Sequence, residues 1–306
     1  MFSTKHSVAA LVGATTLAAC AFTQAQAATW SDSFIGYRYG TDFTEPGPGP
    51  QKDGDKHIEK HILQFNYVGG HSLGQHLFNL DLLQSDSNDP TSGGDTGATE
   101  AYVMYRNQLH YGKLFGDELA FGPVKDVALT GGVDLNTKNT EFAPRKRQLL
   151  AGPTLKFDVP EGFLDLSFFY SHEWNHANFI GPREFDDYYQ VNLAWGLPFE
   201  AGAVPMKFQG FFNYNGAKGK GGGSEHTKPE RLSRPSLMMD VGKLAWGEEN
   251  RLWAGVGYEF WRNKFGNKGV DTDAPRSTSN GTCKQTLTLS EAALHSQARP
   301  VCRSTS

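Results

Sequence analysis

After Trp30 the chain alternates apolar and polar residues with a period of two, which is the period of a β-strand with two different faces. The alternation recurs in segments of about 10 to 13 residues, a length that suits strands tilted across a membrane. Such a strand turns one face toward lipid and the other toward a lumen. Eleven segments of this kind can be delimited, at 33–43, 57–68, 73–84, 99–110, 124–136, 146–158, 163–174, 185–197, 204–214, 235–244 and 251–262.

The connections between these segments alternate in length. Short turns on one rim and long polar loops on the other are typical of bacterial outer-membrane barrels, whereas a soluble β-sandwich has no reason for such regular alternation. The sequence therefore predicts an all-β fold, an antiparallel transmembrane β-barrel of about 12 strands with long extracellular loops and short periplasmic turns. Short turns lie at 69–72, 160–162, 198–203 and 245–250, a longer one at 111–123, and long loops at 44–56, 85–98, 137–145, 175–184 and 215–234.

Charge and hydropathy exclude several other classes of protein. The formal net charge is −4, from 29 basic and 33 acidic side chains, so no basic excess indicates a nucleic-acid partner. The mean hydropathy of −0.48 is typical of soluble proteins. A barrel strand gives the same average, because it combines lipid-facing with lumen-facing residues. No segment of the mature chain has about 20 consecutive apolar residues, which excludes a helical membrane protein.

The first residues have the pattern of a secretory signal peptide. A weakly positive start at Lys5 precedes an apolar run over 8–22 and the small-x-small site Ala25-Gln26-Ala27. We expect residues 1–27 to be removed by cleavage before Ala28, which leads to a location in the outer membrane after export.

An alternative for the leader is lipid attachment, because Leu17-Ala18-Ala19-Cys20 fits the pattern for acylation of Cys20. Cleavage before residue 28 removes that cysteine. Cys283 and Cys302 then remain, and they can form a disulfide with each other in an oxidising periplasm.

The end of the chain departs from the expected pattern. A closed barrel needs an even number of strands, because an open edge in hydrocarbon leaves backbone groups unpaired. We expect the barrel to span 28–279 and the stretch 280–306 to be an atypical tail without strand alternation. A reading-frame shift or a misassembled gene end would explain this tail. The alternative is a weak final strand over Thr282–Leu289.

Three short motifs carry a resemblance to a known family. They are Leu119-Ala120-Phe121-Gly122-Pro123-Val124-Lys125-Asp126, Glu184-Phe185-Asp186-Asp187-Tyr188 and Gly255-Val256-Gly257-Tyr258-Glu259-Phe260. Together with the order of strands and loops over roughly residues 30–275, the chain resembles the nucleoside-specific channel-forming outer-membrane proteins of the Tsx type. The resemblance implies a monomeric barrel of a Gram-negative bacterium with a narrow pore that passes nucleosides or similar small solutes. The implied partners are those solutes, outer-membrane lipids and the barrel-assembly machinery, with no cofactor.

A nucleoside pore needs aromatic rings for the base and polar groups for base edges and ribose hydroxyls. Stacking of a base on an aromatic ring is worth roughly 1–3 kcal/mol, and binding must stay weak enough for the solute to leave. Candidates are the aromatic and hydrogen-bonding residues assigned to the lumen face, although a shift of one residue in strand register would exchange every inward residue for its neighbour. They are Phe34, Arg38, Tyr102, Arg106, Asp187, Tyr188, Lys207, Gln209, Phe211, Asp240, Trp253, Glu259 and Trp261.

Catalytic and metal-binding motifs are weak. His172 and His176 have the spacing of helical metal ligands, but the segment is predicted as a strand that runs into a loop, so we expect no metal site. The glycine-rich stretch 216–223 lacks the Lys-Ser/Thr of a phosphate loop and is predicted to be a flexible extracellular loop. Two alternatives to a channel stay open: a barrel hydrolase, such as a lipase or deacylase, and a structural or adhesive barrel with a plugged lumen.

Overall fold

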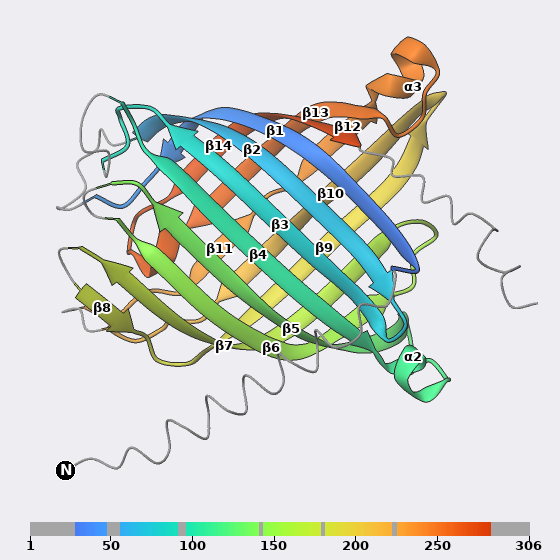
Figure 1. Cartoon of the computed structure of the whole chain (residues 1–306), viewed down its shortest axis with the longest axis horizontal. Coiled ribbons are helices and arrows are strands. Elements are labelled where there is room, and N and C mark those ends of the chain that lie inside the picture. Colours follow the sequence, from blue (N-terminus) through green and yellow to red (C-terminus); the bar gives the residue numbers. More distant parts are fainter. Residues whose placement is uncertain are drawn as a thin grey trace, which may run out of the picture.

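The computed structural model describes residues 28–47, 56–90, 96–140, 143–178, 181–221 and 225–282. Its strands form one sheet that is curled into a barrel, with the strands tilted along it (Figure 1). The strands are β1 (Trp30–Thr44), β2 (Lys56–His71), β3 (Gly74–Ser85), β4 (Thr99–His110), β5 (Val124–Lys138), β6 (Arg145–Phe157), β7 (Phe163–Ala177), β8 (Gly181–Glu184), β9 (Tyr188–Ala201), β10 (Val204–Asn215), β11 (Glu230–Ser233), β12 (Ser236–Asp240), β13 (Leu252–Arg262) and β14 (Thr272–Thr282).

The barrel is closed and antiparallel, with twelve positions around its wall. β8 and β9 both pair with β7, and β11 and β12 both pair with β10 and β13, so each of these two pairs of strands fills one position. The first and last strands meet from Phe34↔Thr282 to Gly40↔Arg276. Closure leaves no edge whose backbone N–H and C=O groups would face lipid unpaired. The predicted fold class is therefore confirmed.

The closing strand corrects the expectation for the end of the chain. The sequence predicted no strand between 262 and 279, yet β14 lies there and continues past the expected domain boundary at 279. Its outward positions, including Asp273 and Ser277, lack the apolar residues that mark the other strands. Backbone pairing with β1 on one side and β13 on the other holds β14 in the sheet, and hydrophobic alternation plays no part. The leader 1–27, the tail from Cys283 onward and most of the alternative strand 282–289 lie outside the described residues.

Two short helices replace what was predicted as strand and turn. α2 (Tyr111–Phe115) follows β4, and α3 (Val241–Trp246) follows β12, so the predicted strand 235–244 ends in a helix. The Asp240 carboxylate caps α3 by accepting a hydrogen bond from the Lys243 backbone N–H at 3.0 Å. Both helices lie at the end of the barrel opposite β8 (Figure 1). Within the described ranges, no helix is long and apolar enough to cross a membrane.

The two faces of the wall differ in chemistry. Large apolar side chains are exposed on the outer face, as a lipid-facing band requires. The inner face carries polar, charged and small residues, and the buried apolar cluster is small, consisting of Phe43, Ile58, Ile62 and Ala274 with Leu83 packed against it. Outward apolar residues include Ile35, Leu63, Phe65, Leu82, Leu129, Leu149, Phe168, Tyr170, Tyr189, Val256 and Tyr258.

Candidate solute path through the barrel lumen

Most of the predicted lumen residues lie on the inner face of the wall. Residues paired directly across neighbouring strands share a face, so strand register places them together with buried polar residues such as Asp81 and Thr130. Twelve of the thirteen predicted residues face inward, and they come from alternate positions of β1, β4, β9, β10, β12 and β13. The inward residues are Phe34, Arg38, Tyr102, Arg106, Tyr188, Lys207, Gln209, Phe211, Asp240, Trp253, Glu259 and Trp261.

Asp187 is the exception, and its assignment to the lumen was wrong. It immediately precedes Tyr188, which faces inward, and successive residues of a strand point to opposite faces. Its carboxylate accepts hydrogen bonds from Tyr170 Oη and His172 Nδ1 on the outer surface. These hydrogen bonds hold the pKa of the Asp187 carboxyl below its usual range.

Charged pairs hold the inward polar residues of β1, β3, β4 and β5 in place. Arg38 Nη2 donates to Asp81 Oδ2 at 2.5 Å. Arg106 Nη1 and Tyr102 Oη both donate to Asp134, at 2.6 and 2.8 Å. All of these bonds are charge-assisted, and such bonds are roughly twice as strong as neutral ones. One wall of the lumen therefore presents a fixed polar surface instead of mobile side chains.

The break between β11 and β12 lets the Arg234 side chain turn into the lumen. Pro235 has no backbone N–H and interrupts the ladder, and the side chain of the preceding Arg234 turns inward. Its Nε donates to Glu259 Oε2 at 2.8 Å, and its charge also interacts with Asp81 on the non-adjacent strand β3. The charge of Arg234 therefore acts on residues of both the β13 and the β3 side of the lumen.

Aromatic rings on the β10–β13 side lie against cations. Lys207 Nζ is 4.4 Å from the centroid of the Trp253 ring, and Lys264 Nζ is 4.4 Å from that of Trp261. Arg234 lies 5.7 Å from the Phe211 ring. Cations over ring faces gain about 0.5–2 kcal/mol, so a planar solute that stacks here must displace them or share the ring with them.

At the long-loop end, the side chains of Glu45, Lys60 and Lys264 meet. Glu45 follows β1, and Lys264 lies in a 3-10 turn, η1 (Lys264–Gly266), that follows β13. Lys60 and Lys264 both donate to Glu45 Oε1, the latter at 2.9 Å. Burial alone raises the pKa of Glu45, but Lys264 and Lys60 outweigh it and hold that pKa well below its usual range. Asp89 binds Lys138 Nζ at 2.6 Å in the same region.

Lys218 shows that a long loop also folds into the lumen. The stretch 216–223 was predicted to be a flexible extracellular loop, yet Lys218 is buried and its Nζ lies 2.9 and 2.8 Å from the two oxygens of Glu173. The same nitrogen lies 4.8 Å from the Phe185 ring. Sequence reasoning missed Lys218, Glu173, Arg234 and Lys264 because three of them lie outside regular alternation. Residues 222–224 lie outside the described residues.

The outer surface holds the remaining candidates for chemistry. His172 and His176 occupy one face of β7, but they lie four strand positions apart, which is about 13 Å and too far for one metal ion. In the part of the chain that the structure describes, no group of three or more His, Cys, Asp or Glu residues is placed to hold a metal ion.

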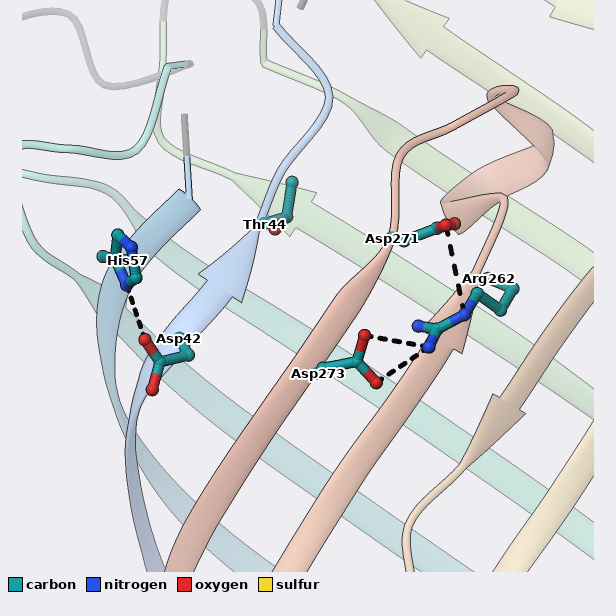
Figure 2. Close-up of a pocket in the computed structure, with 6 residues that line it drawn as sticks. All are labelled: Asp42, Thr44, His57, Arg262, Asp271 and Asp273. Carbon is teal, nitrogen blue, oxygen red and sulfur yellow. Dashed lines mark hydrogen bonds and ion pairs between the residues drawn. The ribbon is translucent and has the colours of Figure 1, made fainter. Parts of the chain in front are cut away.

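A surface hollow of about 340 Å³ opens at the long-loop end, between the ends of β1 and β13 and the starts of β2 and β14 (Figure 2). Its charges are already paired: His57 Nδ1 lies 2.6 Å from Asp42, and Arg262 Nη2 lies 2.8 Å from Asp273. The hollow therefore offers little unpaired charge to a ligand. Its lining residues are Asp42, Thr44, His57, Arg262, Asp271 and Asp273.

Fold and lumen together define the class of this protein as a β-barrel with an apolar outer wall and a polar and aromatic interior. No family model and no curated protein sequence matches the chain.

Several solved structures share the barrel fold at low identity. The KdgM porin in complex with disordered oligogalacturonate is 8% identical, covers 83% of this chain and 100% of its own, and has a TM-score of 0.40. The beta domain of the Bordetella autotransporter Brka is 9% identical, with coverage of 83% and 99% and a TM-score of 0.39. Pseudomonas aeruginosa OccK5 is 10% identical, with coverage of 82% and 97% and a TM-score of 0.29. These likenesses are distant, so function rests on the geometry of the lumen.

Proposed function

We propose that this protein is a passive outer-membrane channel for nucleosides or similar small solutes. The observation that carries the proposal is the contrast between the two faces of the barrel wall. Apolar side chains cover the outer face, and rigidly held charges lie beside aromatic rings on the inner face. A passive channel needs no energy source. It needs a water-filled path with weak sites that a solute can both enter and leave.

The substrate class follows from the residues along the path. Phe211, Trp253 and Trp261 offer ring faces for a base, and Gln209 lies on the same inner face with an amide for ribose and base edges. The resemblance of three motifs to nucleoside-specific channels supports the same substrate class. We also propose that the barrel acts as a monomer and reaches the membrane through the signal peptide and the barrel-assembly machinery.

The test is solute uptake into liposomes that contain the refolded barrel. Nucleosides are compared with free bases and with sugars of similar size. Faster nucleoside entry that saturates with concentration supports a specific site in the lumen. Equal entry of all three solutes contradicts nucleoside specificity and leaves a general pore.

A plugged barrel is the second candidate, because inward charged side chains such as Arg38, Asp81 and Glu259 are buried and held in ion pairs. In that case the long loops carry the function and the interior is structural. Absence of uptake for every solute by barrels with correct heat-modifiable gel migration would favour this candidate over a channel.

A further inference from the structure

Arg276 is a buried cation whose hydrogen-bonding capacity is mostly unused. It projects inward from β14 and is 4% exposed. Its Nη2 donates to the backbone oxygen of Tyr258 at 3.1 Å. Its Nε and Nη1 are buried and have no hydrogen-bond partner among the described residues. A guanidinium stays charged at all ordinary pH values, so burial without acceptors is costly unless another group approaches.

The carboxylates whose charges act on this cation already have arginines of their own. Asp81 binds Arg38, and Glu259 binds Arg234. The charges of all four of these residues act on Arg276, so the group contains three guanidinium ions and two carboxylates. These five side chains together therefore carry an excess of one positive charge.

The neighbouring strands leave room for the Arg276 side chain along the wall. The residues directly opposite it are Gly40 on β1 and Gly257 on β13, and neither has a side chain. A Cβ atom at position 40 would lie 3.1 Å from Cγ of Arg276 and 2.9 Å from the backbone oxygen of Pro275. Glycine at that position gives the arginine side chain room to lie along the wall.

We propose that Arg276, supported by Arg38 and Arg234, binds the carboxylate of a small organic acid as it passes through the lumen. The excess of one charge matches a single carboxylate better than a doubly charged phosphate ester. This proposal rests on the channel function and extends its substrate class from neutral nucleosides to small solutes that carry one carboxylate. The two unpartnered nitrogens supply the donors, and the solute supplies the acceptors that Arg276 lacks.

The experiment is a calorimetric titration of the purified full-length barrel in detergent at low ionic strength. The probes are benzoate, its neutral analogue benzamide, and chloride. We expect benzoate to bind, benzamide to bind at least about tenfold more weakly, and chloride to compete only at higher concentration. Benzoate that binds no better than benzamide or chloride overturns the proposal without any variant.

Arg276→Gln locates the site, and Arg251→Gln is the matched control. Arg251 is a half-exposed arginine that pairs with Glu248 outside the lumen. We expect the first substitution to weaken benzoate binding at least about tenfold and Arg276→Lys to restore part of it, while the control changes nothing. Equal loss in the control variant, or no loss in Arg276→Gln, overturns the assignment.

The outcome separates the anion site from the channel itself. Nucleoside uptake without benzoate binding removes the anion site and leaves the channel. Benzoate binding without uptake of any solute keeps the site and contradicts the channel. If Arg276→Gln does not fold, as judged by heat-modifiable migration, the three-probe titration of the unaltered protein still decides whether a carboxylate is bound in preference to chloride.

Discussion

Gly40 on β1 is paired directly with Arg276 on β14, at the seam where the first and last strands close the barrel. The Phe43 ring and the Arg276 side chain both approach the place where a Cβ atom would stand at position 40. Closure of the barrel and the position of a buried lumen cation therefore depend on the same small residue.

Gly40→Ala is expected to destabilise the barrel. The added Cβ would lie 2.9 Å from the Pro275 backbone oxygen, 3.0 Å from the Phe43 ring and 3.1 Å from Arg276 Cγ, so the seam must shift. Overpacking of this kind costs about 1–3 kcal/mol. Thermal unfolding in detergent measures it. Gly131→Ala on β5 is the control, because nothing lies within 4 Å of its Cβ position, and equal melting of the two variants would contradict the seam argument.

Trp253→Ala is expected to weaken nucleoside recognition. If a base stacks on this ring in place of Lys207, its loss removes roughly 1–3 kcal/mol and raises the concentration for half-maximal uptake about fivefold or more. Uptake by proteoliposomes measures the change. The control is Trp246→Ala on α3, a tryptophan that lies outside the lumen. An unchanged half-maximal concentration in Trp253→Ala would rule this ring out as a stacking surface.

The long-loop end of the barrel is expected to lose stability in acid. The folded-state pKa of Glu45 is lowered, so its ion pairs with Lys60 and Lys264 contribute above the unfolded-state value of about 4.3 and are lost as the pH falls below it. The pKa of Asp89 is also lowered, because Lys138 outweighs the effect of burial, and it acts in the same direction.

Glu45→Gln separates this effect from general acid denaturation. Melting temperatures of the protein and the variant are compared at pH 7, 5 and 3. We expect the difference between them to be nearly constant from pH 7 to 5 and to shrink toward pH 3. A difference that is the same at all three pH values would mean that the charge on Glu45 is not what stabilises this end.

The exposed aromatic side chains of the two short helices are expected to lie in the membrane interface. Trp246 on α3 is 65% exposed and Phe115 on α2 is 67% exposed, next to the apolar outer band. Aromatic belts occupy this position in barrels. Brominated lipid quenches the fluorescence of tryptophans that contact lipid. In liposomes of this lipid, Trp246→Phe should therefore reduce the extent of quenching more than Trp253→Phe, whose ring lies in the lumen. The reverse order would place α3 away from lipid.

The sequence predicted the strands whose two faces differ in hydrophobicity, and their order and connections followed from loop lengths. β14 was missed because Asp273 and Ser277 stand where apolar residues mark the other strands, and pairing on both sides is a long-range property that local pattern does not contain. The α3 helix was missed because Val241 extends the apparent alternation of Leu237 and Met239, whereas the Asp240 cap starts a helix.

The lumen residues were predicted well where strand parity decides them and poorly elsewhere. Trp253 and Glu259 follow from alternation within β13, but Asp187 lies at a strand entry and was assigned to the same face as its neighbour Tyr188, against that alternation. Lys218 and Lys264 reach the interior from loops, and only the folded backbone brings them there. Their long basic side chains gave no signal that distinguished them from solvated loop residues.

Single-channel recording in planar bilayers tests the central claim most directly, because the claim is that an open path for small solutes runs through the lumen. The account predicts small, discrete conductance steps that a saturating nucleoside reduces and a sugar of similar size does not. Zero conductance from barrels whose gel migration shows that they are folded would contradict it, and would mean that the buried side chains of the inner face close the path.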